Sequence, residues 1–282
     1  MSMITTGQDG GVVAVRLAAR AINPLSRLFQ RELATLLEKL EVRRAKLNAV
    51  TISFDAESGA SSHELAHLMA LTPAQAADCM QMLAAYNRLL LRLENLGLPV
   101  VAALSGEVSG HAFGLALACH HRLGLHDTRF SLPQVRLGLA PVAGEIVRTV
   151  RLVGLRAAMP LLLDGAQFDA VQARQAGLLH AIAADVAQLA RLSVAVQDKG
   201  ASQPWRARQH SPPGGMPDAP ALRALLPVWT ARLAGQAPPA AAILCAMVEG
   251  MRVNFEQALL IESRYFCQTA INPRPRKDRL YL

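Results

Sequence analysis

The sequence predicts an α/β fold built on a mainly parallel sheet, with a helical region towards its C-terminal end. Short apolar runs of the kind found in buried strands alternate with longer segments of helical periodicity, and this alternation indicates βαβ units. The chain of 282 residues is 52% hydrophobic and 18% charged, so it can bury a sizeable core without metal or disulfide cross-links. For this length we expect one main domain with an appendage.

The first elements follow one another closely from the N-terminal end. VVAVRL at 12–17 predicts one strand and AVTISF at 49–54 predicts a second. Between them, residues 24–47 carry leucines at helical spacing, which predicts an amphipathic helix. Asn23 is a suitable cap for this helix, with Pro24 at its first position.

The middle of the chain continues the alternation. A polar loop at 55–63 precedes a helix that opens with the capping box TPAQ at 72–75 and runs to about Leu96. VVAAL at 100–104 then predicts a buried strand, and the glycine and alanine-rich run 110–119 predicts a short apolar helix.

Further strands and helices are expected up to about residue 180. We expect a strand at 120–125 and helical segments at 144–154 and 155–163. A second capping box at 169–172 opens a helix that ends at Gly177.

The composition divides the chain into three parts. Residues 1–200 hold the strand and helix alternation and form the predicted core. Residues 201–239 are rich in proline and glycine and are expected to form an irregular linker segment. Residues 240–282 form the C-terminal region, in which 240–270 is expected to be helical.

Charge and cysteine content narrow the class of protein. The net charge of +8 favours anionic partners, but the arginines are scattered and no nucleic-acid-binding motif is found, so no nucleic acid is expected as a partner. No apolar run reaches the about 18 residues needed to span a bilayer, and no signal peptide is found, so we expect a cytoplasmic protein without a membrane partner. The widely spaced cysteines are interpreted as reduced core residues: Cys79, Cys119, Cys245 and Cys267.

Two long stretches resemble the crotonase (enoyl-CoA hydratase/isomerase) superfamily. They are PVVAALSGEVSGHAFGLALACHHRLGL at 99–125 and RFSLPQVRLGLAPVAGEIVRTVRLVG at 129–154. The run DGAQFDAVQARQAGLLH at 164–180 looks like the next helix of that superfamily. The resemblance implies a ββα spiral core that encloses a pocket for a CoA thioester, whose phosphates suit the positive charge of this chain.

Three later motifs extend the resemblance over nearly the whole chain. QPW at 203–205, PPGG at 212–215 and VEGMRVNFEQALLIESRYF at 248–266 look like the hydratase half of the bifunctional bacterial β-oxidation subunit. The order of these motifs is specific, although none of them is specific alone. Members of the superfamily often form trimers or hexamers, whereas the bifunctional subunits cover their own hydratase site with C-terminal helices. The resemblance therefore implies a homo-oligomer, a trimer or hexamer, or a different mode of association.

The resemblance also implies an oxyanion hole made of two backbone N–H groups, which stabilise the enolate-like charge on the thioester oxygen. The first donor lies in a loop that corresponds to 61–64 here, so it would be the N–H of His63. The second lies at the glycine-rich turn 110–112, so it would be the N–H of His111. Their imidazoles are either incidental side chains or acid/base groups, since imidazole titrates near neutral pH.

Both glutamates that act on water in an ordinary hydratase of this superfamily are replaced. Their places are held by Gly114, which has no side chain, and by Gln134, which cannot take a proton at neutral pH. The glycine-rich loop of the superfamily corresponds to 141–145, where Glu145 is an added carboxylate. Glu145 is either a relocated acid/base group or a helix-terminal residue that points to solvent.

Two functions stay open on this basis. The preferred one is an acyl-CoA-binding pseudoenzyme that is poor or inactive as a hydratase. The other is an active crotonase-type enzyme with a relocated acid/base group, acting as an isomerase, hydrolase or hydratase on a CoA thioester. Neither needs a prosthetic group, and coenzyme A enters as part of the ligand. His120 and His121 are interpreted as strand residues, and no metal is expected because no ligand spacing is present.

Overall fold

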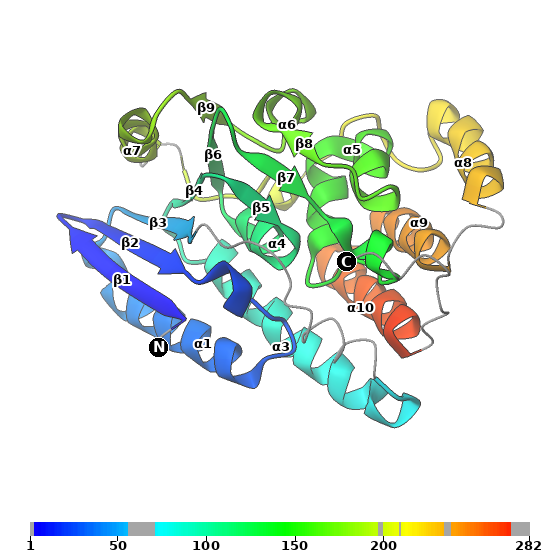
Figure 1. Ribbon diagram of the computed structural model, residues 1–282, viewed down its shortest axis with the longest axis horizontal. Coiled ribbons are helices and arrows are strands. Elements are labelled where there is room, and N and C mark those ends of the chain that lie inside the picture. Colours follow the sequence, from blue (N-terminus) through cyan, green and yellow to red (C-terminus); the bar gives the residue numbers. More distant parts are fainter. Residues whose placement is uncertain (1–2, 56–70, 197–199, 209, 234–237, 272–282) are drawn as a thin grey trace.

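The computed structural model describes residues 3–55, 71–196, 200–208, 210–233 and 238–271. A six-stranded sheet forms one side of the molecule (Figure 1). Its strands, in spatial order, are β1 (Ile4–Asp9), β2 (Val12–Leu17), β3 (Ala49–Phe54), β4 (Val100–Leu104), β6 (His121–Leu125) and β9 (Ala181–Ala183). All neighbours are parallel except β1 and β2, so the expectation of a mainly parallel sheet is confirmed.

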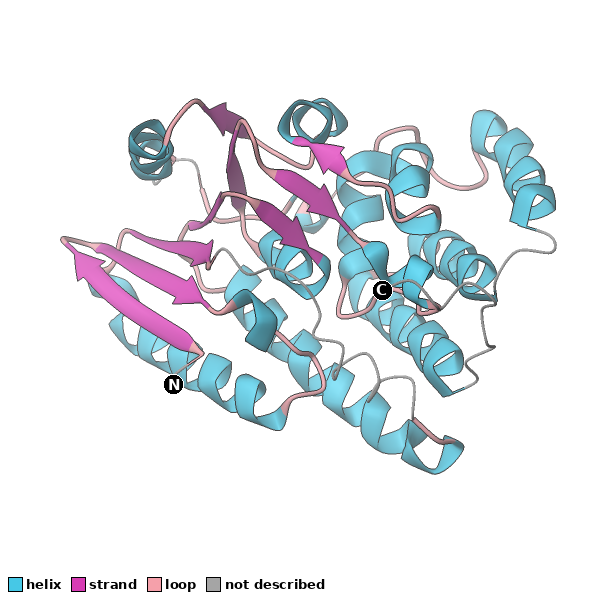
Figure 2. Ribbon diagram, viewed as in Figure 1, coloured by secondary structure: helices cyan, strands magenta, loops and turns pink. Residues whose placement is uncertain are grey.

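Helices cover both faces of this sheet and extend beyond it (Figure 2). The α-helices are α1 (Arg27–Arg43), α3 (Ala76–Glu94), α4 (Gly110–Ala118), α5 (Glu145–Leu163), α6 (Ala170–Ala176), α7 (Val186–Ala195), α8 (Pro220–Leu233), α9 (Pro238–Met251) and α10 (Phe255–Ile271). Short 3-10 helices are η1 (Ala19–Ala21), η2 (Arg44–Lys46), η3 (Pro73–Gln75), η4 (Pro133–Leu137) and η5 (Pro204–Arg206).

The position of β4 in the middle of the sheet explains why its sequence is apolar at every position. Val100 and Ala102 face the main core with α1 and α3, whereas Val101 faces a second cluster with Leu189 of α7. Successive strand side chains point to opposite faces, so a strand that is covered on both faces must be apolar throughout.

A smaller sheet continues from the ends of the central strands. It consists of β5 (Glu107–Ser109), β7 (Arg129–Ser131) and β8 (Phe168–Asp169), with β5 and β7 parallel. β5 leads directly into α4, and β7 leads into η4 and then α5. This sheet therefore places the beginnings of those elements next to each other.

Two local predictions are corrected by the structure. The first long helix begins at Arg27 and is capped by Ser26, whose hydroxyl accepts the Phe29 N–H, so the assignment of its start to Asn23 and Pro24 is wrong. Asn23 instead accepts the Leu25 N–H in the turn before the helix. Asn23 is therefore a turn residue, because its short amide side chain can bond a backbone N–H two residues on.

The segment 201–239 is not irregular throughout, because α8 forms a helix within it. Proline 220 stands at the start of this helix, where the missing N–H costs nothing, so a proline-rich composition is compatible with it. The division of the chain into a core, a linker and a C-terminal region stays a prediction. The region expected to be helical from 240 to 270 consists of α9 and α10.

α5 contains a sharp break, in agreement with the two helical segments predicted there. Gly154 has φ 79° and ψ 166°, a conformation that other residues avoid. A Cβ atom at this position would lie 1.9 Å from the Pro213 carbonyl oxygen, within the PPGG motif. The close approach of the two segments thus requires glycine. No described helix is both long enough and apolar enough to cross a membrane.

Candidate functional site

The pairing of β5 with β7 brings two of the predicted site positions together. Ser109 lies opposite Ser131 in the parallel register, and their hydroxyl oxygens are 2.9 Å apart. His111 follows Ser109 as the second residue of α4, and Gln134 follows Ser131 within η4. A Cβ atom on Gly110 would lie 3.8 Å from Gln134 Nε2, so the two segments are in contact at this point.

Glu145 joins both segments from the start of α5. Its side chain has no exposed surface, so the alternative in which it points to solvent is wrong. Glu145 Oε1 lies 2.6 Å from His111 Nδ1, and Glu145 Oε2 accepts Gln134 Nε2–H at 2.6 Å. Oε2 also accepts the Val142 N–H at 3.1 Å. Three polar groups thus surround the Glu145 carboxyl at the N-terminus of α5, where the helix dipole favours negative charge.

The Glu145 side chain occupies the space beside Gly114. A Cβ atom at Gly114 would lie 2.6 Å from Glu145 Cγ and 2.9 Å from its Oε1, so any side chain there would require Glu145 to move. In the superfamily pattern a glutamate belongs at this place and a glycine belongs at 145. Gly114 and the Glu145 side chain therefore lie in contact, and a carboxylate lies beside α4.

The Gln134 side chain complements the Glu145 carboxylate. Its amide donates to the Glu145 carboxylate, which a deprotonated glutamate at the same position could not do. Two carboxylates at 2.6 Å would have to share a proton, because like charges at that distance cannot both ionise. Glutamine at 134 is therefore compatible with the carboxylate at 145 in a way that an ionised glutamate would not be.

A strained turn presents Glu145 to these partners. Ala143 has φ 65° and Gly144 has φ 85°, so two successive residues lie in the left-handed region. A Cβ on Gly144 would lie 1.7 Å from Arg148 Nη1, which leaves no room for another residue. Such strain persists only where the surroundings enforce it, so the side chains that hold the turn are part of the site.

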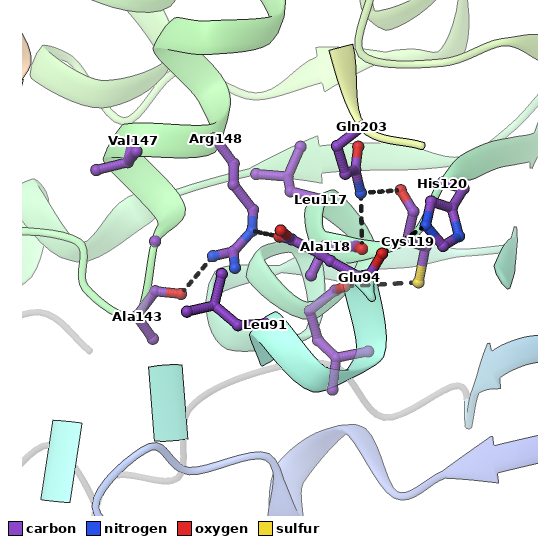
Figure 3. A network of polar contacts seen from close by, with 12 residues as sticks. Leu91, Glu94, Leu117, Ala118, Cys119, His120, Ala143, Val147, Arg148 and Gln203 are labelled. Atoms are coloured by element: carbon purple, nitrogen blue, oxygen red, sulfur yellow. Dashed lines mark hydrogen bonds and ion pairs between the residues drawn. The ribbon is translucent and has the colours of Figure 1, made fainter. Parts of the chain in front are cut away.

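One of these side chains is Arg148, which is fully buried. Figure 3 shows its polar contacts. Its Nη1 donates to the Ala143 carbonyl at 3.0 Å, and its Nε donates to Glu94 Oε1 at 2.6 Å. Its guanidinium also lies over the ring of Phe255, 5.5 Å from the centroid. Arg148 therefore connects the turn to α3 and to the start of α10.

The QPW motif packs on the same region. Gln203 Nε2 donates to the carbonyl groups of Ala118 and Cys119, at 2.8 and 3.1 Å, and so satisfies the C-terminal end of α4 (Figure 3). The Trp205 ring stacks on Phe255, with 5.1 Å between centroids and 5° between planes. The motif thus fixes the C-terminal end of α4 and supports the Phe255 ring over which Arg148 lies.

The other side chain that holds the turn is Glu262 of α10. Its carboxyl oxygens accept the N–H groups of Gly144 at 2.6 Å and Val147 at 2.9 Å, so it caps the N-terminus of α5. Only 1% of Glu262 is exposed. Burial raises the pKa of Glu262 to about 8, and the negative charge of Glu145 adds to this, while the two N–H groups and Arg148 oppose it.

The raised pKa of Glu262 predicts a pH dependence of folding stability. The folded protein holds this proton more tightly than the unfolded chain, so between pH about 4.5 and about 8 the free energy of unfolding falls as pH rises. We expect the wild type to lose up to about 1.4 kcal/mol per pH unit relative to Glu262→Gln, measured by urea unfolding across this range. His120 and His180, whose pKa values burial lowers to about 4 and about 3, contribute equally to both proteins and cancel. Parallel pH profiles for the two proteins would contradict the prediction.

The side chains of His120 and His121 contact backbone carbonyl and N–H groups. His120 Nδ1 accepts the Val100 N–H at 3.0 Å, and its Nε2 lies 3.0 Å from the Glu94 carbonyl oxygen, which it can reach only as a donor. His121 Nε2 contacts the Gly200 carbonyl, and its ring packs edge-on against His180. Within the described residues, no group of three or more His, Cys, Asp or Glu side chains is placed to hold a metal ion.

Several of the predicted site residues thus form one cluster: His111, Gly114, Gln134 and Glu145. His63, the other predicted oxyanion donor, lies outside the described residues, and the predicted roles of all five residues stay predictions. Sequence reasoning did not single out Glu262, although a signal was present. Glu262 stands at helical spacing with Leu259 and Phe266 on the buried face of α10, and a carboxylate on an apolar stripe indicates a buried partner.

Known proteins share this arrangement of elements. The family model described as "Enoyl-CoA hydratase/isomerase" matches residues 7–210, well over half of the chain. The structure of an enoyl-CoA hydratase from Bacillus anthracis is similar, with a TM-score of 0.59 and 21% identity over 94% of this chain and 90% of that chain.

Two further solved structures agree. An enoyl-CoA hydratase from Mycobacterium smegmatis has a TM-score of 0.61 and 18% identity, over 97% of this chain and 93% of its own. A putative enoyl-CoA hydratase from Streptomyces avermitilis has a TM-score of 0.62 and 17% identity, over 96% and 87% of the two chains. The predicted fold class is confirmed by these similarities.

Proposed function

Because the chain belongs to the enoyl-CoA hydratase/isomerase family, we propose that it binds an acyl-CoA thioester and transfers protons on the bound acyl chain with the His111–Glu145 pair. The proposal includes little or no hydration of enoyl thioesters. The observation that carries it is the buried Glu145 carboxylate, which lies beside Gly114 and pairs with the His111 imidazole at 2.6 Å.

The roles within the pair follow from their hydrogen bonds. Both oxygens of Glu145 are occupied by donors, so its role is to orient the imidazole through Nδ1 and to stabilise its protonated form. Gln134 cannot exchange a proton, so it serves to hold the carboxylate. His111 is then the group that takes and returns a proton. Its own backbone N–H stands in the first turn of α4, where the helix dipole favours a developing negative charge on the thioester oxygen.

A single acid/base group suits an isomerase better than a hydratase. Adding water to a double bond requires a base that takes a proton from the water and an acid that protonates carbon. Shifting a double bond requires only that one proton leave one carbon and return to another, while the electron pair passes through the enolate of the thioester. The imidazole can serve both steps of that shift.

The test combines three measurements on the purified protein. We expect calorimetry to show binding of butyryl-CoA, and mass spectrometry to show deuterium uptake at its α-carbon in heavy water. A 3-enoyl-CoA is expected to convert to the 2-enoyl-CoA, with little loss of 2-enoyl absorbance through hydration. His111→Asn should reduce exchange and isomerisation by about 10²-fold or more, since a positioned acid/base group contributes about 10²–10⁴-fold. His126→Asn, on an exposed residue after β6, is the matched control.

A second candidate, a protein that only binds acyl-CoA, is favoured by one observation. The Glu145 carboxylate is saturated by protein donors without any ligand, as expected of a purely structural group. Binding of butyryl-CoA without exchange or isomerisation above buffer would support this candidate. Absence of binding would contradict both candidates, and hydration within tenfold of an ordinary family hydratase would contradict the proposed roles.

A further inference from the structure

The N-terminus of α5 cannot cap itself. Its N-cap residue is Gly144, which has no side chain to accept a backbone N–H. The next residue, Glu145, directs its carboxylate to Gln134 and His111 and to the Val142 N–H, away from the N–H groups of the first turn. The Glu145 N–H reaches the Val142 carbonyl at 3.4 Å, but the buried N–H groups of Gly144 and Val147 need acceptors from another part of the chain.

Glu262 supplies them from α10, 118 residues further along the chain. It accepts the N–H of the residue before Glu145 and that of the residue two after it, so its two bonds flank Glu145 on both sides. On the other side of the turn, Arg148 holds the Ala143 carbonyl. The bonds from Glu262 and from Arg148 together hold a backbone that lies in the left-handed region at Ala143 and Gly144.

We propose that Glu262 is a positioning residue for the candidate active site, which holds the turn at Ala143 and Gly144 so that Glu145 reaches His111. The expected effect of Glu262 on activity rests on the proposed function. The effect of Glu262 on the contact between Glu145 and His111 can be tested independently of that function. Without the Glu262 bonds, the N–H groups of Gly144 and Val147 would be buried without acceptors, and the turn could relax from its strained conformation.

The charges near Glu262 agree with this role. Glu145 and Arg148, both on α5, are the charged groups whose fields act on Glu262. Two adjacent buried carboxylates resist ionising together, and burial and the neighbouring Glu145 both raise the pKa of Glu262. A protonated carboxyl group still accepts hydrogen bonds from backbone N–H groups, so Glu262 can cap the helix in either protonation state.

The experiment compares Glu262→Ala and Glu262→Gln with Ser263→Ala. Ser263 is the matched control because it is buried on the same helix and bonds only the Leu259 carbonyl of its own helix. The first readout is the downfield proton resonance of the His111–Glu145 hydrogen bond, assigned by its loss in His111→Asn. The second is the rate of α-carbon deuterium exchange on butyryl-CoA, separated into kcat and KM.

We expect Glu262→Ala to lose or shift the resonance and to lower kcat at least tenfold, with KM within threefold of the wild type. Glu262→Gln keeps one acceptor oxygen, so it should lie between Glu262→Ala and the wild type, and it replaces Glu262→Ala if that variant does not fold. Ser263→Ala should leave both readouts unchanged. A resonance that survives in Glu262→Ala, with stability alone reduced, would overturn the proposal. If the wild type shows no exchange, the proposed function fails while the resonance still decides the role of Glu262.

Discussion

Introducing two glutamates through Gly114→Glu with Gln134→Glu is not expected to produce hydration while Glu145 is present. A side chain at 114 meets Glu145 Cγ at 2.6 Å, and a glutamate at 134 faces the same carboxylate. We expect this double variant to lose at least about 2 kcal/mol of stability through overpacking and like charge. Adding Glu145→Gly removes the obstacle and should raise crotonyl-CoA hydration at least about 10²-fold over the wild type.

Loss of the enoyl absorbance measures the rate, and urea unfolding measures stability. Gly114→Ala with Glu145→Gly is the control for the removal of the Glu145 side chain. It frees the same space beside position 114 as the triple variant does, but it adds no carboxylate, so it should stay inactive. The single and double variants at 114 and 145 also form a mutant cycle. In the free energy of unfolding we expect a coupling of about 0.5–3 kcal/mol in favour of the wild-type pair, Gly114 with Glu145. Equal hydration by the double and triple variants would contradict the structural explanation.

Breaking the Arg148–Glu94 ion pair will give the largest loss of stability. Both side chains are fully buried, with Arg148 Nε 2.6 Å from Glu94 Oε1. Removing one partner leaves an uncompensated buried charge, so Arg148→Leu or Glu94→Leu should each cost about 3–5 kcal/mol in the free energy of unfolding. The double variant should cost less than the sum, because it leaves neither charge behind.

The exposed pair of Arg252 and Asp218 serves as the control for this experiment. Its atoms are 2.8 Å apart, but the side chains are 50% and 72% exposed. Arg252→Ala should therefore change the free energy of unfolding by at most about 1 kcal/mol. Comparable losses for the buried and the exposed pair, in denaturant titrations at the same pH, would show that burial does not set the cost.

Apolar periodicity predicted the central strands and the long helices well, because most of them bury a clear face. β1 was missed because its sequence, ITTGQD, is polar and five of its six residues are exposed, which leaves no pattern to detect. β5 and β7 have three residues each, too few for periodicity. α8 was hidden by the prolines around it, although Pro220 is compatible with a helix start.

For the candidate site, the resemblance identified Gly114, Gln134 and Glu145 one by one. Their contact could not be predicted, because it depends on the register of β5 with β7 and on the strained turn before α5. Glu262 reaches that turn across 118 residues of sequence, and spacing carries no information over such a distance. The contact between Gly114 and Glu145 likewise depends on the folded arrangement and is not visible in the sequence.

The capping of α5 by α10 also sets an order of events during protein synthesis. The ribosome makes Gly144 long before Glu262, and at about 5–20 residues per second the interval of 118 residues takes about 6–24 seconds. Throughout that interval the turn at Ala143 and Gly144 lacks the acceptor that Glu262 provides. The N-terminal sheet can pair from its own residues in the meantime, but the candidate site is complete only when α10 has left the ribosome and docked.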